Sequence, residues 1–217
     1  MRAVFFTGLI LLLITGCGPD VIDLRYQDVS RRDSLVFYQG MLFTGTVEDY
    51  CGRDDDAPLL KRVNYMDGKL HGLNTEWHCN GKMRERSYYI RGERHGSFEQ
   101  WYESGLLHVR SNFNIGLLHG LYEEWHENGQ IWERSKYAYG LADGQYTLWF
   151  ENGQIATRGN HSDGGQLNGP FERWYENGQL RERGNLVNGE WHGVYEEWHE
   201  DGTLSRRSIY ENGRQVN

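Results

Sequence analysis

Histidine is the residue whose type and spacing first suggest metal chemistry in this chain, because seven of its nine histidines recur at two fixed places. Four precede a glycine and three follow a tryptophan: His71, His95, His119 and His192, then His78, His126 and His199. A zinc ion needs its nitrogen ligands within about 2.1 Å. Equivalent atoms of successive β-hairpins lie about 10 Å apart, which is two strand spacings. Histidines of neighbouring repeats therefore cannot share an ion, and we expect no metal site and no cofactor.

Paired glutamates could supply the two carboxylates of a glycosidase, as in Glu123-Glu124 and Glu196-Glu197. Adjacent residues of a strand point to opposite faces, whereas a catalytic pair must converge on one bond. The pairs are also repeated, and an active site is normally a single asymmetric constellation. The sequence contains no nucleophile elbow, P-loop or HExxH motif. We therefore predict that the protein is not an enzyme.

A run of three acidic residues, Asp54-Asp55-Asp56, interrupts the first repeat between Cys51 and Pro58. Calcium favours several oxygen ligands, so the run could bind this ion. A charge run is more often a solvated surface segment. We favour a solvated acidic loop and leave calcium binding as the alternative.

The spacing of the glycines defines the structural elements that must position these side chains. The chain contains 28 glycines and only 3 prolines. One glycine opens each unit of about 24 residues, a second follows nine residues later, usually after Asn or Asp, and a third lies four residues before the next unit. The opening glycines are Gly45, Gly72, Gly96, Gly120, Gly144, Gly169 and Gly193. Six clear copies and one divergent first copy cover residues 37–217.

Tryptophan and arginine form two columns in this repeat. Tryptophan lies five residues after six of the opening glycines: Trp77, Trp101, Trp125, Trp149, Trp174 and Trp198. Arginine recurs in all seven units: Arg62, Arg86, Arg110, Arg134, Arg158, Arg183 and Arg207. Strand alternation places the tryptophans on one sheet face and the aromatic residues two and six places after the glycine on the other. We expect a ladder of indole, guanidinium and carboxylate that partly replaces a core.

Asn-Gly between alternating segments predicts a type I′ hairpin turn, because both central residues of that turn need positive φ. The turn then fixes which residues face each other across the hairpin. Aromatic residues should pair with aliphatic ones, as His126 with Ile131. Glutamate should pair with arginine in four units: Glu99 with Arg110, Glu123 with Arg134, Glu172 with Arg183, and Glu196 with Arg207.

The predicted fold is all-β: an elongated, single-layer antiparallel array of about seven β-hairpin repeats. Seven hairpins span roughly 65–70 Å at about 4.8 Å per strand. A short hairpin alone is marginal in water, so neighbouring repeats must stabilise one another and the ends need caps. Cys51 and Cys79 fall at nearly equivalent places in consecutive hairpins. An exported protein retains disulfides, so we predict a Cys51–Cys79 disulfide, with two free thiols as the alternative.

Residues 1–16 have the pattern of a signal peptide, with Arg2 before an apolar run from Val4 to Ile14 that is too short to span a bilayer. The segment Ile14-Thr15-Gly16-Cys17 resembles the bacterial lipobox, which implies cleavage before Cys17 and a lipid on its sulfur. By the same resemblance Gly18 favours the outer membrane of a Gram-negative cell. Two acyl chains give firm anchoring. Residues 17–36 would then form an N-terminal tether and residues 37–217 the repeat domain.

Three elements carry a family resemblance: Tyr122–Trp125, Glu127–Gln130 and Gly116–Gly120. They resemble the MORN-repeat variant, which in bacteria often occurs in proteins labelled YwqK-type antitoxins. The resemblance covers about 180 of 217 residues, and the first unit departs from it by its acidic insertion. It implies a binding or scaffolding role, and ordinary MORN arrays are associated with membranes, phospholipid and protein assembly.

The net charge of −8 argues against nucleic acid and against a polybasic membrane patch. Three functions stay open. The first is a protein-interaction scaffold at the bacterial envelope, including an antitoxin-like or immunity-like role. The second is a cell-wall carbohydrate-binding module that stacks sugars on exposed aromatic side chains, and the third is a structural spacer. The tryptophan and arginine columns are the candidate binding face, while the identity of the partner does not follow from the sequence.

Overall fold

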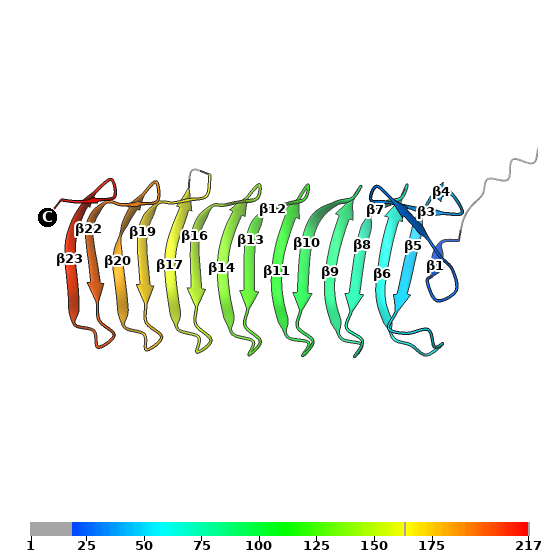
Figure 1. Cartoon of the computed structure of the whole chain (residues 1–217), viewed down its shortest axis with the longest axis horizontal. Helices are drawn as coiled ribbons and strands as arrows, with labels where there is room; N and C mark the ends of the chain where they lie inside the picture. The colour runs from blue at the N-terminus through cyan, green and yellow to red at the C-terminus, as the bar shows by residue number, and fades with distance from the viewer. Residues whose placement is uncertain (1–18, 163, 217) are drawn as a thin grey trace, which may run out of the picture.

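Seven β-hairpins stand side by side in one 21-stranded sheet (Figure 1) in the computed structural model, which describes residues 19–162 and 164–216. The hairpins are β5 (Gly45–Tyr50) with β6 (Leu59–Met66), β8 (Gly72–Trp77) with β9 (Met83–Ile90), β10 (Glu93–Trp101) with β11 (Leu107–Asn114), β13 (Gly120–Trp125) with β14 (Ile131–Ala138), β16 (Gly144–Trp149) with β17 (Ile155–Ser162), β19 (Gly169–Trp174) with β20 (Leu180–Val187), and β22 (Gly193–Trp198) with β23 (Leu204–Glu211). The predicted all-β, single-layer antiparallel array is confirmed. No helix in the described ranges is long and apolar enough to cross a bilayer.

Two-residue strands lie along one edge of the array. Five of them connect hairpins: β7 (Lys69–Leu70), β12 (Leu117–Leu118), β15 (Leu141–Ala142), β18 (Gln166–Leu167) and β21 (Glu190–Trp191). The sixth, β24 (Arg214–Gln215), follows the last hairpin. At β12 the turn residues Ile115 and Gly116 have φ of 50° and 76°, and Asn114 pairs with Leu117. Two central residues with positive φ define a type I′ turn. The type I′ geometry therefore lies at this edge.

The Asn-Gly turns at the opposite edge differ from the prediction. Gly129 has a φ of 85°, whereas Asn128 is not among the positive-φ residues. The Gly129 N–H donates to the His126 carbonyl and the His126 N–H donates to the Gln130 carbonyl, at 2.9 and 2.8 Å. This is a hairpin loop that ends in a left-handed glycine and a bulge.

The bulge changes the pairing next to the turn. Trp125 faces Ile131 in place of His126, after a register shift between Glu124 and Trp125. The predicted aromatic–aliphatic pairs are wrong by one residue on the first strand, because the bulge takes up one residue. The glutamate–arginine pairs lie beyond the bulge and are confirmed in all four units.

The described part of the expected tether, residues 19–36, is a folded cap. Strand β1 (Val21–Asp23) pairs in parallel with β5, and β2 (Ser30–Arg32), β3 (Leu35–Tyr38) and β4 (Met41–Leu42) form a separate three-stranded sheet. Ile22, Val36, Phe43 and Val47 make a buried cluster between them. The apolar residues of this segment are too irregularly spaced to signal a repeat, yet together they cover the first hairpin.

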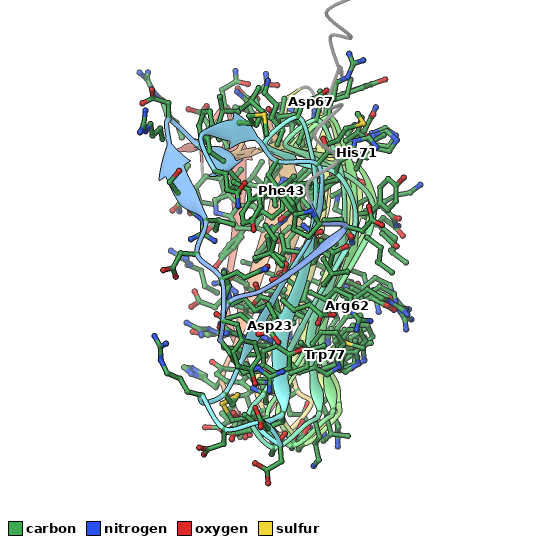
Figure 2. All side chains as sticks on the ribbon, turned by 90° about the vertical axis from the view of Figure 1, so that its right-hand side faces the viewer. Asp23, Phe43, Arg62, Asp67, His71 and Trp77 are labelled. Carbon is green, nitrogen blue, oxygen red and sulfur yellow. A yellow bond between two sulfur atoms is a disulfide. The ribbon has the colours of Figure 1, made fainter. Side chains whose placement is uncertain are left out.

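The sheet has two unlike faces, seen end-on in Figure 2, where Arg62 and Trp77 project on one side and Phe43 and Asp23 lie on the other. We call the side of the tryptophan and arginine columns the outer face. The inner face carries buried side chains such as Phe98, Phe171 and Tyr195, at 8%, 5% and 5% exposure. The expected division of aromatic residues between the faces is thus found, and only the inner face has a closed core.

Candidate interaction surface

The predicted ladder is present on the outer face, built from strands of adjacent hairpins. Arginine guanidinium carbons lie 5.5–5.9 Å from the indole centroids of the next repeat in four pairs: Arg86 and Trp101, Arg110 and Trp125, Arg158 and Trp174, and Arg183 and Trp198. Distances below about 6 Å are in the range of cation–π attraction. The ladder therefore links successive repeats.

Glutamates lie beneath the guanidinium groups. Arg134 Nη2 is 2.8 Å from Glu123 Oε1, and their side chains are 56% and 10% exposed. Arg183 and Glu196 show the same contrast, with 52% and 16% exposure at 2.7 Å. Because the carboxylates are sheltered and the guanidinium groups are not, the outer face presents mainly cationic and aromatic groups along its length.

Exposed apolar side chains accompany the ladder in several hairpins, and the sequence argument missed them. Leu73 pairs across its hairpin with Tyr88, and Val194 with Ile209, and these four are 48%, 40%, 44% and 42% exposed. Leu121 is 43% exposed at the place equivalent to Leu73. Residues one place after the opening glycine point to the same side as the tryptophans by strand alternation. The residue after the opening glycine is apolar in several repeats, and this pattern could have indicated the exposed apolar side chains from the sequence.

The inner face is closed by the residues that fold over it. Trp191 lies in T-shaped contact with Phe171 and Tyr195, at 5.5 and 4.8 Å between ring centroids. Serines line the floor of this layer: Ser87 and Ser135 donate to Glu85 and Glu133, at 3.1 and 2.7 Å. Charged side chains remain accessible on this face, since Arg173 and Arg206, which lie over Phe171 and Tyr195, are 43% and 47% exposed.

Burial, followed by the hydrogen bond that its hydroxyl donates to Glu182 at 2.9 Å, raises the pKa of Tyr195 to about 12. The neutral phenol is therefore favoured in the folded protein, while the unfolded chain loses this proton near pH 10. Stability contributed by Tyr195 is complete below pH 10 and is lost as the pH rises through about 12. Urea unfolding at increasing pH should show this fall in the free energy of unfolding, and the fall should be less steep for Tyr195→Phe. An equally steep fall in the variant would contradict the attribution to Tyr195.

The repeated polar residues at the Asn-Gly edge join one repeat to the next. The ring or hydroxyl six places after the opening glycine bonds to the carbonyl of the next tryptophan: His78 to Trp101, Tyr102 to Trp125, His126 to Trp149, and Tyr175 to Trp198. A carbonyl only accepts, so the histidine Nε2 carries the proton. Among the described residues no cluster of three or more His, Cys, Asp or Glu could hold a metal.

Asparagine has a different role from the one that the turn rule gave it. The Asn128 Nδ2 group donates to the Glu151 carbonyl of the next repeat at 2.8 Å, while its Oδ1 accepts from the Gln130 N–H at 2.8 Å. The same two bonds recur at Asn152 and Asn177. The amide therefore serves as a link between repeats.

The acidic loop of residues 54–56 is held by an arginine of the cap. Arg25 Nη1 donates to the carbonyls of Asp54 and Asp55, at 3.1 and 3.0 Å, and Arg25 is also paired with Asp23 at 2.8 Å. The Tyr26 hydroxyl donates to Asp55. The hydrogen bond from Arg25 lowers the pKa of Asp23. A guanidinium thus occupies two backbone carbonyl oxygens of this loop.

Cys51 and Cys79 form a disulfide between the loop of the first hairpin and the turn of the second, with 5.5 Å between their Cα atoms. Alkylation of the unfolded protein should add no label at these cysteines without reductant and two labels after reduction, as read by mass spectrometry. Equal labelling under both conditions would overturn the pairing. Cys17, the predicted lipidation site, lies outside the described residues, as does the signal peptide 1–16.

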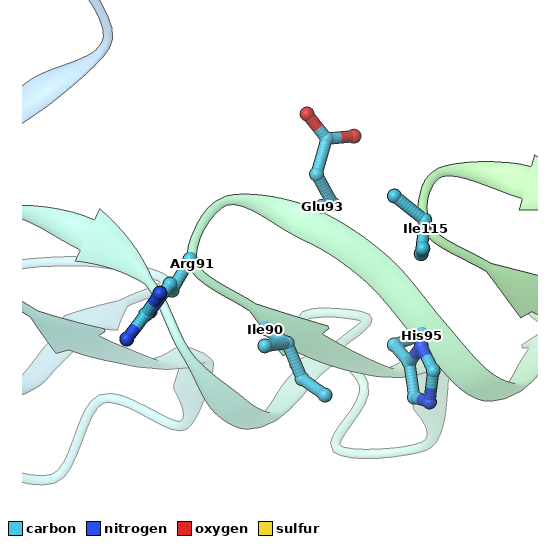
Figure 3. A pocket seen from close by; sticks show the side chains of 5 residues that line it. All are labelled: Ile90, Arg91, Glu93, His95 and Ile115. Atoms are coloured by element: carbon cyan, nitrogen blue, oxygen red, sulfur yellow. The ribbon is translucent and has the colours of Figure 1, made fainter.

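A hollow opens at the type I′ edge between two successive turns (Figure 3). Ile90, Arg91, Glu93, His95 and Ile115 line it. Ile115 is 71% exposed, and Tyr139 in the next turn is 66% exposed. These turns project sideways from the sheet, so the edge is a second exposed apolar area beside the outer face.

The architecture defines a class: an open β-hairpin repeat protein whose units are stabilised by contacts with their neighbours. Four segments match the family described as the MORN repeat variant, residues 118–139, 142–163, 167–188 and 191–212. The chain is therefore a repeat protein that contains MORN repeat variants. The hairpins before residue 118 have the same register, since Gly72 pairs with Tyr89 as Gly120 pairs with Tyr137. No curated protein matches the chain.

Proposed function

We propose that this protein is a non-catalytic scaffold that binds a protein partner along its outer face and is held at the bacterial envelope by a lipid on Cys17. The observation that carries the proposal is the exposed apolar side chains beside the ladder in several hairpins, with Leu73 at 48% and Val194 at 44% exposure. Each of these two pairs across its hairpin with another exposed apolar residue, and clustered exposed apolar groups mark interaction sites. Aromatic and arginine side chains are enriched in protein interfaces. An antitoxin-like or immunity-like role is one form that such binding would take.

A cell-wall glycan is the alternative ligand. Sugars stack on open aromatic faces, but four of the six repeat indoles lie beneath guanidinium groups. Trp77 and Trp149 have no such contact among the described residues. Only two of the six repeat indoles are thus free of a guanidinium within the described ranges. This favours a protein partner over a glycan strand that would stack on an indole in every repeat. A protein that serves only as a structural spacer would not require these exposed apolar side chains.

Crosslinking and mass spectrometry of the membrane-anchored protein in its own cells test the proposal. Crosslinks to one partner should fall when Leu121→Arg and Val194→Arg charge the outer face. Leu141→Arg, on the type I′ edge where Leu141 is 53% exposed, is the matched control and should leave them unchanged. Retention on purified peptidoglycan would favour the glycan, and the absence of both ligands would favour the spacer. Cys17→Ser should release the protein from the membrane fraction.

A further inference from the structure

One hairpin of the outer face interrupts the ladder. The place three residues after the opening glycine holds glutamate in five units, but threonine in two, Thr75 and Thr147. Thr147 faces Arg158 across its own hairpin and faces Arg134 across to the preceding one. A threonine hydroxyl cannot neutralise either guanidinium. The charge balance of the column therefore changes at this hairpin.

The two arginines beside Thr147 respond differently. Arg134 turns to the glutamate of its own hairpin and donates two hydrogen bonds to Glu123, at 3.0 and 2.8 Å. Arg158 lacks a glutamate in its own hairpin, and Glu172 in the next is 3.7 Å away. Among the described residues the Arg158 guanidinium makes no hydrogen bond, although its side chain is 48% exposed. Its one carboxylate contact among the described residues is thus the long ion pair with Glu172.

Trp149, in the hairpin that holds Thr147, has no guanidinium over it within the described part of the chain. Arg134 bonds to Glu123 of its own hairpin, although Arg110, which bonds to Glu99 in the same way, still lies over Trp125. Trp149 pairs with Ile155 in the hairpin that holds Thr147 and Arg158. A hollow beside this hairpin is lined by Gly153, Gln154, Ile155, Arg158, Trp174 and Gly178. Its indole is Trp174, over which the Arg158 guanidinium lies at 5.5 Å. One guanidinium, the indole beneath it and the aliphatic Ile155 side chain are thus gathered at one hollow of the outer face.

Thr75 shows that threonine alone does not create this arrangement. Its neighbours Arg62 and Arg86 both have glutamate partners: Arg62 Nε lies 2.8 Å from Glu48, and Arg86 Nε donates to Glu99 at 3.1 Å. Arg207 in the last hairpin has a 3.5 Å contact with Glu196. At 3.7 Å, Arg158 has the longest ion-pair distance of the seven column arginines in the described part of the chain.

We infer that Arg158 receives the carboxylate of an aspartate or glutamate side chain from a protein partner that lies along the outer face. A guanidinium binds a carboxylate through two parallel N–H···O bonds. The methylene groups of that side chain would lie against Ile155 and the Trp174 indole in the hollow, which a free inorganic anion would not use. The chain as a whole carries a charge of −8, so this site would fix where an acidic segment docks. The inference rests on the proposed function, whose partner it describes.

The test is a titration of the purified full chain with a tetraglutamate peptide, acetylated and amidated at its ends and followed through the indole and arginine Nε–H signals in NMR spectra. The Trp149, Trp174 and Arg158 signals should shift, whereas the equivalent tetraglutamine peptide should leave them in place. Arg158→Gln should weaken binding at least about tenfold, and Arg134→Gln should not. Equal shifts at all six repeat indoles, or unchanged binding by Arg158→Gln, would overturn the inference. Equal competition by inorganic phosphate would also overturn it.

A second pair of variants keeps the test independent of folding defects. Thr147→Glu restores the missing carboxylate and should abolish peptide binding while the fold is kept, whereas Thr75→Glu is the matched control and should bind as the parent does. Peptide binding that survives Thr147→Glu would contradict the inference. If the peptide fails to bind but a partner is still crosslinked, the inference fails and the proposed function stands. If the peptide binds and no partner is crosslinked, the proposed function fails.

Discussion

Replacing Ile22 with alanine is expected to lower the free energy of unfolding by about 2–5 kcal/mol, the usual cost of deleting a large buried aliphatic side chain. Ile22 is 0% exposed and packs with Val36, Phe43 and Val47. The cavity would lie between β1 and the first hairpin, so the cap would separate from β5. Equilibrium unfolding in urea, followed by tryptophan fluorescence, measures the loss.

Val21→Ala is the matched control, because Val21 is the preceding residue of β1 and is 49% exposed. It should change the free energy of unfolding by less than about 0.5 kcal/mol. Equal effects of the two substitutions would contradict the view that β1 acts through its buried side. A loss confined to the first hairpins would show instead that the repeats unfold piecewise, as one-dimensional arrays can.

The cap is also what the repeat pattern could not reveal. Spacing of glycine and tryptophan predicted the seven hairpins and the glutamate–arginine pairs, since these recur with the period of the backbone. Residues 19–36 share no period with the array, and their role depends on Ile22 meeting Val47 across a parallel pair of strands. A contact that occurs only once in the chain cannot be predicted from a repeating pattern.

The turn geometry escaped prediction for another reason. Asn-Gly fits type I′ by its backbone preference, but Asn128 instead uses its amide to bond the next repeat, at 2.8 Å from the Glu151 carbonyl. The type I′ turns hold residues such as Ile115 and Tyr139, which are poor choices by local preference. Contacts with neighbouring hairpins therefore determine the turn types. A rule based on the sequence of one hairpin does not include these contacts.

The uneven ladder follows from the same dependence on neighbours. All seven arginines were named from the sequence as one column, although Arg134 and Arg158 have different surroundings. The difference arises from Thr147, which lies on a strand between them. The positions of the arginines can thus be predicted from a single repeat. The partners of each arginine depend on the residues of two neighbouring repeats.

Gly184→Val is expected to lower the free energy of unfolding by up to about 3 kcal/mol, as an overpacked core position does. A Cβ atom at Gly184 would lie 2.8 Å from Trp191 Cζ3 and 2.9 Å from Cε3. The residue has no positive φ, so backbone strain does not contribute, and valine otherwise favours a strand. The expected loss therefore reports mainly the contact with the indole that folds over the inner face, with a smaller contribution from the Tyr195 ring at 3.4 Å.

Trp191→Leu supplies the control, because Leu118 holds the equivalent place over Ser111 in an earlier repeat. In that background the indole is gone, and Gly184→Val should cost little or be stabilising. The difference between the two costs, measured by urea unfolding of the four proteins, is the coupling energy of the pair. If the costs of the two substitutions were additive, the sizes of residues 184 and 191 would not be coupled. The packing of the inner face would then not depend on which side chain folds over it.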